Sequence, residues 1–343
     1  MRHTLFAVLR YVLLALLFLN ANSAALPVVS GSQEQDKEGP QLSEGERKAA
    51  SAINEAPDAA AKLTAAAAFV KKYPKSSGRQ QIAEYVAAQI GQIKAPAEKL
   101  RLAEEFQKVF TAETELVAIK EIMVDSYAVS YRVDEAFNLG TALLAKNPDN
   151  LHVLAQLTMT GANAAKQQNP KYISQSMQYG TKAIGMIEAN SKPTSMSDAS
   201  WNYHKGMLPE LYQQTAVLAL FSGNKAEGKA RIDKAVVLNP NDPFNYIVIG
   251  SLVNEEYQQV AKSYQALPAG AQKDEALKKA NGLIDQMIDL YAHAVGLATG
   301  RPEYQQLQTQ VLQDLTASYK YRHKSLEGLQ ELIDKYKTPA KPQ

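Results

Sequence analysis

Histidines and carboxylates are the side chains in this sequence that could serve as acids, bases or metal ligands. The histidines stand at His3, His152, His204, His293 and His323. No two of them are three or four residues apart, which is the spacing that places two metal ligands on one face of a helix. Because histidines so widely scattered are ordinary surface or core residues, the sequence predicts no metal site.

Paired carboxylates occur at Glu104-Glu105 and Glu255-Glu256. Adjacent positions on a helix point in different directions, so these pairs indicate solvated helix faces and not partners in acid–base catalysis. The sequence has no glycine-rich phosphate-binding motif and no cysteine, which excludes thiolate catalysis, disulfides and Cys-ligated metals. We therefore expect a protein that is not an enzyme and that binds no cofactor.

The charge balance bears on the kind of partner. Lys and Arg together number 37, and Asp and Glu together number 35. A protein that binds nucleic acid needs a clustered basic excess to offset the phosphates. Nucleic acid is therefore not an expected partner.

The N-terminus has the pattern of a secretory signal peptide. Arg2, His3 and Arg10 precede the apolar run from Tyr11 to Leu19, and small residues follow it. This run is shorter than the roughly 20 residues that cross a membrane. We expect cleavage near Ala25 and a periplasmic or secreted protein; the alternative is an uncleaved N-terminal anchor. No later segment is long and apolar enough to span a membrane.

Four segments are predicted along the chain: a signal peptide (1–25), a disordered leader (26–42), a helical array (43–336) and a disordered tail (337–343). The leader is polar and lacks any period, and Pro339 and Pro342 exclude a helix in the tail. Within the array, apolar residues recur at steps of three and four, most clearly between 274 and 298. Alternation typical of strands is missing, so the predicted fold class is all-α.

The helices come in pairs with repeated terminators. Asn-Pro or Tyr-Pro ends three predicted helices, at Pro74, Pro148 and Pro240. Within the pairs, Asn224 followed by Glu227 indicates a capping box, and Asp134 is expected to cap another helix. Insertions are expected near residues 190–208 and 266–273, where the spacing between terminators is too long.

This organisation resembles the tetratricopeptide-repeat family, which has a 34-residue helix–turn–helix unit. Two tyrosines, Tyr212 and Tyr246, are 34 residues apart, and both match the family's first large aromatic position. Small residues match the close-packing positions at Ala216, Gly228 and Gly250. The resemblance implies a right-handed α-solenoid of about seven stacked antiparallel helix pairs. A solenoid of another repeat class is the alternative.

The resemblance also implies a partner-binding groove formed by the first helix of each unit. Carried over residue by residue, the groove-facing positions hold Glu121, Asp125, Glu210, Gln213, Val217, Phe221, Ile247, Ser251 and Asn254. Aromatic residues such as Phe221 and Phe244 would anchor a peptide or a helix of a partner. The alternative is that Leu220, Phe221 and Phe244 belong to the core between repeats.

We expect from these patterns a non-catalytic scaffold that holds an envelope or secreted protein in its groove. One alternative is a periplasmic protein that binds a small molecule or glycan, in a pocket at the expanded repeat 254–275. A structural spacer without a ligand is the other.

Overall fold

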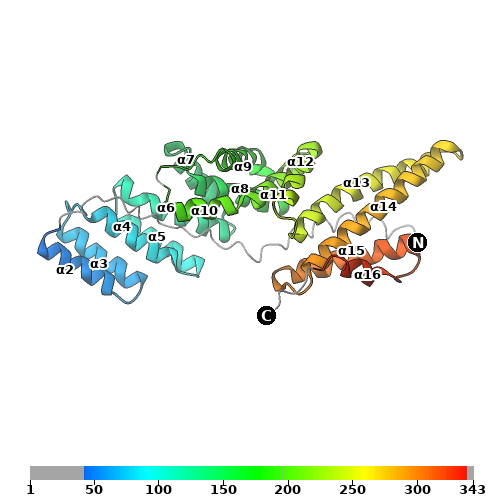
Figure 1. The fold of residues 1–343 in the computed structure, drawn as a ribbon. Coiled ribbons are helices and arrows are strands. Elements are labelled where there is room, and N and C mark those ends of the chain that lie inside the picture. Colours follow the sequence, from blue (N-terminus) through cyan, green and yellow to red (C-terminus); the bar gives the residue numbers. More distant parts are fainter. Residues whose placement is uncertain (1–41, 195, 338–343) are drawn as a thin grey trace. The chain divides into compact units, whose positions relative to one another are not determined.

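The computed structural model describes residues 42–194 and 196–337 (Figure 1). Throughout these residues the regular elements are helices, with no strand, which confirms the predicted all-α fold. The predicted signal peptide, nearly all of the leader and all but the first residue of the tail lie outside the described residues. None of the described helices combines the length and the apolar character that crossing a membrane requires.

The described helices follow one another as seven pairs, with one extra helix, α10 (Asp198–Gly206), after the fourth pair. The pairs are α2 (Glu44–Glu55) with α3 (Ala59–Lys72), α4 (Arg79–Gly91) with α5 (Pro96–Val109), α6 (Glu113–Val129) with α7 (Val133–Lys146), α8 (Leu151–Lys166) with α9 (Ile173–Glu188), α11 (Leu208–Phe221) with α12 (Lys225–Leu238), α13 (Pro243–Ala266) with α14 (Ala271–Ala298), and α15 (Gln305–His323) with α16 (Leu329–Asp334). Single 3-10 turns precede α9 (Pro170–Tyr172) and α15 (Pro302–Tyr304).

The predicted terminators and most of the caps are confirmed. Helices α3, α7 and α12 end directly before the proline motifs. The Asn224 side chain accepts a hydrogen bond from the Glu227 amide at 3.2 Å, and its own amide donates to the Glu227 carboxylate at 2.9 Å. The prediction for Asp134 is wrong. Arg132 is the N-cap of α7, and Asp134 lies in the first turn, where a negative charge favours the helix N-terminus.

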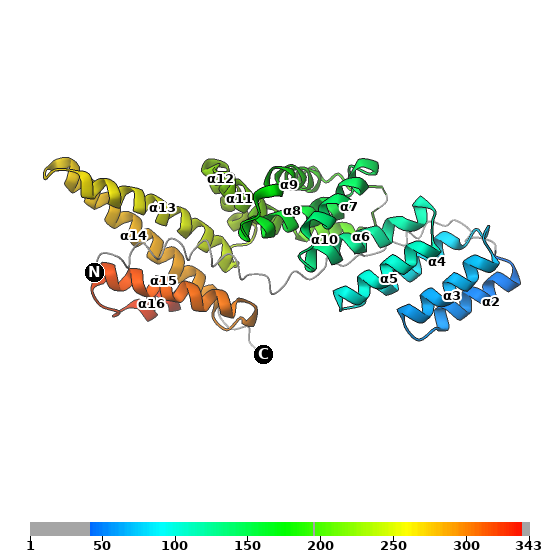
Figure 2. The same cartoon turned by 180° about the vertical axis from the view of Figure 1, so that it is seen from behind.

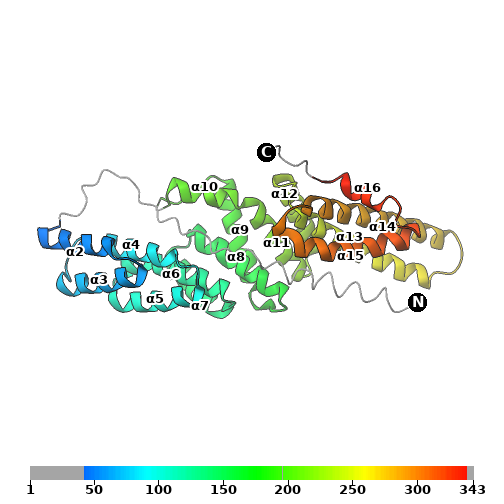
Figure 3. The same cartoon turned by 90° about the horizontal axis from the view of Figure 1, so that it is seen from below.

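The chain divides into two compact units, and the division falls within α8 and α9. The N-terminal unit comprises described residues 42–161 and 178–207, and the C-terminal unit comprises 162–177 and 208–337. In the N-terminal unit, α2 to α7 form three consecutive pairs in which each helix packs against its chain neighbours (Figure 3). This is the organisation of an α-solenoid, in which a pair buries its apolar face only by stacking on the next pair.

The core of the N-terminal unit is a continuous apolar layer that runs from α2 to α6. Phe69, Phe106 and Phe110 are fully buried in it, and the rings of the last two contact at a tilt of 34° with centroids 4.6 Å apart. Glu115, itself buried, binds Arg79 at 2.8 Å and also accepts hydrogen bonds from the Thr111 and Ala112 amides. One carboxylate therefore ties α4 to α6 and satisfies the two amides directly before α6.

The core of the C-terminal unit shows why small residues stand at two of the predicted close-packing positions. A Cβ atom added to Gly228 would lie 2.5 Å from the Leu220 side chain, and one added to Gly250 would lie 2.4 Å from the Tyr291 ring. Those distances are far below van der Waals contact. Glycine thus permits α12 to approach α11, and α14 to approach α13.

The two expected insertions take helical form. Helix α10 occupies the first. At the second, α13 continues to Ala266 and α14 begins at Ala271, so the expansion lengthens a helical hairpin instead of forming an irregular loop (Figure 2).

Candidate functional site

The structure buries most of the residues that the family resemblance assigned to a groove. Five of the nine are in the interior, namely Asp125, Gln213, Val217, Ile247 and Asn254. Glu121, Phe221 and Ser251 are half-buried, and Glu210 is exposed. Phe244 is also buried, while Leu220 and Phe221 pack partly against the same apolar cluster. The alternative that some of these residues form the core between repeats is therefore correct for Phe244.

One of the buried polar members, Gln213, belongs to a polar cluster of the C-terminal unit that is built from α8, α11 and the start of α13. We call this the amide–lysine cluster; its residues are Asn163, Lys166, Glu210, Gln213, Gln214, Asp242 and Asn245. Helical periodicity explains the contribution of α11: residues 210, 213 and 214 share one face, and residue 217 continues it as a buried valine. Sequence reasoning identified Glu210 and Gln213 of this set and missed the others.

Lys166 is the centre of the cluster. Its ammonium donates to the Gln214 Oε1 at 3.1 Å and to the Asn163 Oδ1 at 3.2 Å, and it lies 5.4 Å above the centre of the Phe244 ring. Burial, only partly offset by the negative charge of Glu210, lowers the pKa of Lys166 to about 8. A cation that is buried among neutral amides and an aromatic ring retains a strong attraction for an anionic or carbonyl oxygen.

A second set of contacts continues the cluster along α13. The Gln213 amide donates to the Asp242 Oδ2 at 3.1 Å and to the Asn245 Oδ1 at 2.9 Å. Asp242 also caps α13 by accepting from the Phe244 amide, and the Asn245 amide donates to the Asn239 carbonyl. Gln213 thereby links the end of α12 and the start of α13 to α11.

Part of the hydrogen-bonding capacity of the cluster is unused within the described residues. An ammonium has three N–H donors, and two of those on Lys166 have oxygen partners. The amide nitrogens of Asn163 and Gln214 donate to no other described group, and Asn163 and Glu210 reach solvent. Unused donors therefore remain at Lys166, Asn163 and Gln214, and the cluster reaches solvent at Asn163 and at the carboxylate of Glu210.

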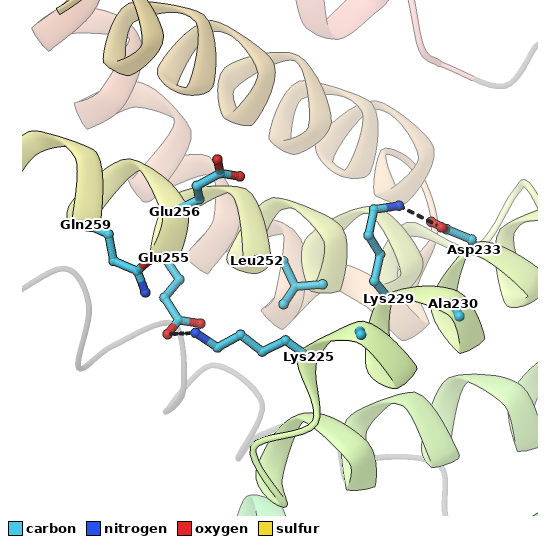
Figure 4. A pocket seen from close by; sticks show the side chains of 9 residues that line it. Lys225, Lys229, Ala230, Asp233, Leu252, Glu255, Glu256 and Gln259 are labelled. Atoms are coloured by element: carbon cyan, nitrogen blue, oxygen red, sulfur yellow. Dashed lines mark hydrogen bonds and ion pairs between the residues drawn. The ribbon is translucent and has the colours of Figure 1, made fainter. Parts of the chain in front are cut away.

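A groove between α12 and α13 is the other candidate binding surface, with a volume of about 580 Å³ (Figure 4). It is lined by Lys225, Ala226, Lys229, Ala230, Asp233, Leu252, Glu255, Glu256 and Gln259. Its charges are matched inside the chain: Lys225 binds Glu255, Lys229 binds Asp233 at 2.6 Å, and Lys279 binds Glu256 at 2.9 Å. Three of its residues belong to the expanded repeat 254–275, where the sequence suggested a small-molecule pocket.

The structure also brings together a buried acid–base pair in the N-terminal unit. Both oxygens of Asp125 lie 3.0 to 3.1 Å from the Nε2 of His152. Burial alone would lower the pKa of His152, but the charge and hydrogen bond of Asp125 raise it to about 9. Beside it, Asn150 donates to Glu121 at 2.6 Å, and burial raises the pKa of that carboxyl.

Sequence reasoning missed the Asp125–His152 pair because the two residues are 27 positions apart. Extending the repeat pattern by one unit beyond Pro148 would have given His152, on its own helix, a groove-facing position like that of Asp125, so a signal was present. The pair consists of the two side-chain types that orient and charge an imidazole in many proteins. Both side chains are buried, and each of the two Asp125 oxygens contacts the His152 Nε2.

Among the described residues, no group of three or more His, Asp or Glu side chains is arranged to hold a metal ion. In comparisons with known proteins, no family model matches the chain, and no curated protein is detectably similar to it in sequence.

Proposed function

We propose that this protein is an exported, non-catalytic scaffold that holds a segment of an envelope or secreted protein at the amide–lysine cluster. The observation that carries the proposal is the buried Lys166 ammonium, together with the amides around it that keep free hydrogen-bonding capacity at the edge of the cluster. Burying a polar group costs free energy unless the group finds a hydrogen-bond partner. Polar groups with no role beyond contact with water would therefore remain on the surface.

The chemistry of the cluster suits a polypeptide. Side-chain amides both donate and accept, as peptide groups do, so they can pair with a partner's backbone whatever its sequence. Lys166 can donate its remaining N–H to a carbonyl or carboxylate oxygen, and Phe221 adds half-buried aromatic surface nearby on α11. Such contacts would hold an extended segment, with the aromatic surface supplying much of the binding free energy.

The cellular location is part of the same proposal. Its support is the sequence of residues 1–25, in which a basic start, a short apolar run and small residues follow in the order of a secretory signal. An array without cysteine is also compatible with an oxidising compartment. The tetratricopeptide resemblance supports a partner-holding role on the residues Tyr212, Gly228, Tyr246 and Gly250.

The decisive experiment is site-specific photocrosslinking in cells of the native host. A photoreactive residue replaces Phe221 on α11 or Glu210, the exposed carboxylate of the cluster, and in the control it replaces Val237, which is 79% exposed on α12. We expect one envelope or secreted protein to crosslink at the first two positions and not at the third. Equal crosslinking from Val237 would show that capture is unspecific.

A matched pair of substitutions then tests the role of Lys166. Lys166→Met keeps the length of the side chain and removes its charge, and Lys234→Met makes the same change at an exposed position on α12. Loss of the crosslinked partner only in Lys166→Met supports the proposal. Retention of the crosslinked partner in both variants would contradict the proposal. Circular dichroism of each variant separates loss of binding from loss of folding.

The groove between α12 and α13 supports a second candidate function, binding of a small molecule or glycan. Alanines and Leu252 form its apolar surface, and its charged rim is the part that a polar ligand would contact. A ligand that binds only the folded state raises the melting temperature. A library of metabolites and oligosaccharides that leaves the melting temperature of the wild type unchanged would remove this alternative.

A further inference from the structure

Helix α10 carries a buried histidine with an unused nitrogen. His204 is 1% exposed. Its Nδ1 lies 2.8 Å from the Ser200 carbonyl oxygen, which can only accept, so Nδ1 carries the proton. The lone pair of Nε2 then has no hydrogen-bond partner among the described residues. The docked helix therefore contains a buried, neutral imidazole.

The group that faces His204 across the helix interface is a second imidazole, that of His152 on α8. The two rings meet edge to face with their centroids 5.8 Å apart. Because Asp125 binds His152 and raises its pKa to about 9, His152 is a cation at neutral pH. A proton on His204 would thus place a second positive charge beside the first, in a site where its new N–H has no acceptor.

We propose that α10 is a pH-sensitive latch, docked through neutral His204 and released when His204 takes up a proton. The helix is an addition to the series of pairs: Ser197 caps it, and it is joined to α9 by the segment 189–197 and to α11 by Met207. Its release therefore leaves every helix pair of the fold intact. This inference does not depend on the proposed scaffold function.

The other titratable and charged groups around the latch lie on α5, α6 and α10, with Lys192 in the segment before α10. On α6, Glu121 has a raised pKa because of burial, so it loses its negative charge early as the pH falls and leaves His152 less neutralised. Asp125 on α6 remains the partner of His152, and Lys99 on α5 lies within electrostatic range of Asp125. On α10 itself, Tyr203 stacks edgewise on His204, Lys205 lies over the Trp201 ring, and Asp198 binds Lys192 at 2.6 Å.

The sign of the effect follows from linkage. Burial lowers the pKa of docked His204 to about 4, whereas a released imidazole returns to about 6.5. The released state therefore binds more protons in this range, and docking weakens roughly ten-fold for each pH unit below about 6.5. The effect ends near pH 4, after a total change of roughly 300-fold in the docking equilibrium.

The chain contains its own reporter for this motion. Trp201 is its single tryptophan, lies on α10 three residues before His204, and is 5% exposed. In the full-length mature protein we would measure Trp201 emission and its quenching by acrylamide from about pH 7.5 to about pH 4.5, with the helix content followed by circular dichroism. We expect a reversible red shift and a several-fold rise in quenching, while the helix content is retained.

Two substitutions separate the latch from general acid effects. His204→Phe keeps a flat ring and cannot titrate, so Trp201 should remain shielded over the whole range. His323→Phe, at an exposed position on α15, should behave as the wild type does. A wild type in which Trp201 stays shielded to pH 4.5, or a His204→Phe variant with the transition of the wild type, overturns the proposal.

If His204→Phe does not fold, the titration of His204 is followed instead in the wild type, by nuclear magnetic resonance with isotope-labelled histidine. A His204 resonance that titrates well below the usual histidine range, together with the Trp201 transition, supports the latch. A His204 resonance with an ordinary pKa, or one that titrates without any change in Trp201, overturns it.

Discussion

Asp125 and His152 form a buried ion pair in which both carboxylate oxygens lie 3.0 to 3.1 Å from one imidazole nitrogen. The pair joins α6 to α8, the first helices of two consecutive pairs, inside the N-terminal unit. It contributes to stability only while His152 carries a proton. Its effect on folding can therefore be measured through pH as well as through mutation.

The first prediction concerns this pair. The folded pKa of His152, about 9, is raised above its unfolded value of about 6.5. The contribution of the ion pair to the free energy of unfolding is then complete below about pH 6.5 and is lost as the pH rises through about 9. Asp125→Asn should lower the free energy of unfolding by about 3 kcal/mol at pH 6 and by much less at pH 10. Urea denaturation at both pH values measures this; an equal loss at the two would contradict it.

The second prediction concerns Lys166, whose effect on stability changes with pH in the opposite direction. Burial lowers its folded pKa to about 8, below the unfolded value of about 10.5, so the charged form costs stability at neutral pH. That cost is relieved as the pH rises from about 8 to about 10.5. Lys166→Met removes the cost but leaves the Gln214 and Asn163 oxygens without a donor. We expect a net change in the free energy of unfolding within about 1 kcal/mol at pH 7.

The matched measurement for Lys166 is the difference in stability between wild type and Lys166→Met as the pH is raised. The wild type should gain on the variant between about pH 8 and pH 10.5. Because His152 titrates in the same way in both proteins, its contribution cancels in the difference. A difference in stability that stays constant with pH would show that burial does not lower the pKa of Lys166.

The third prediction tests the close approach of α13 and α14. A Cβ at Gly250 would meet the Tyr291 ring at 2.4 Å, and Tyr291 is itself buried, so neither side can move freely. Gly250→Ala should destabilise the protein by about 1–3 kcal/mol. The control is Gly282→Ala within α14, where nothing lies within 4 Å of the new Cβ. There we expect a gain of up to about 1 kcal/mol, because alanine favours a helix interior.

The Gly250 prediction concerns packing, so thermal or urea denaturation of both variants suffices. If Gly250→Ala is neutral, the separation of α13 and α14 is larger than the structure shows. If both variants lose stability equally, the loss does not come from the contact with Tyr291.

The fourth prediction concerns residues 1–25. If the N-terminal pattern is a signal peptide, protein purified from its native host begins near Leu26, after cleavage at Ala25. The intact mass, together with the N-terminal peptide after proteolysis, measures this directly. Recovery of a peptide that still contains Tyr11 to Leu19 would favour the retained anchor.

Helix positions and helix ends were available from the sequence. Steps of three and four between apolar residues, and prolines at 74, 148 and 240, are local features, and a helix forms from local hydrogen bonds. The small residues Gly228 and Gly250 were likewise predictable as contact points, because only a missing side chain lets two helices approach so closely. Asp134 shows the limit of local signals, since a helix boundary can move by one or two residues.

What the tertiary structure decided is which face of each helix is covered. Periodicity shows that Gln213 and Val217 share a face, but it cannot show what packs on that face, and both are buried where a groove was expected. The partnerships that carry the proposals join residues 27, 48 and 52 positions apart: Asp125 with His152, Lys166 with Gln214, and His152 with His204. Such distant pairings depend on the packing of helices against one another, because the free energy of burying a charge is set by what surrounds it, and those surroundings exist only after the chain has folded.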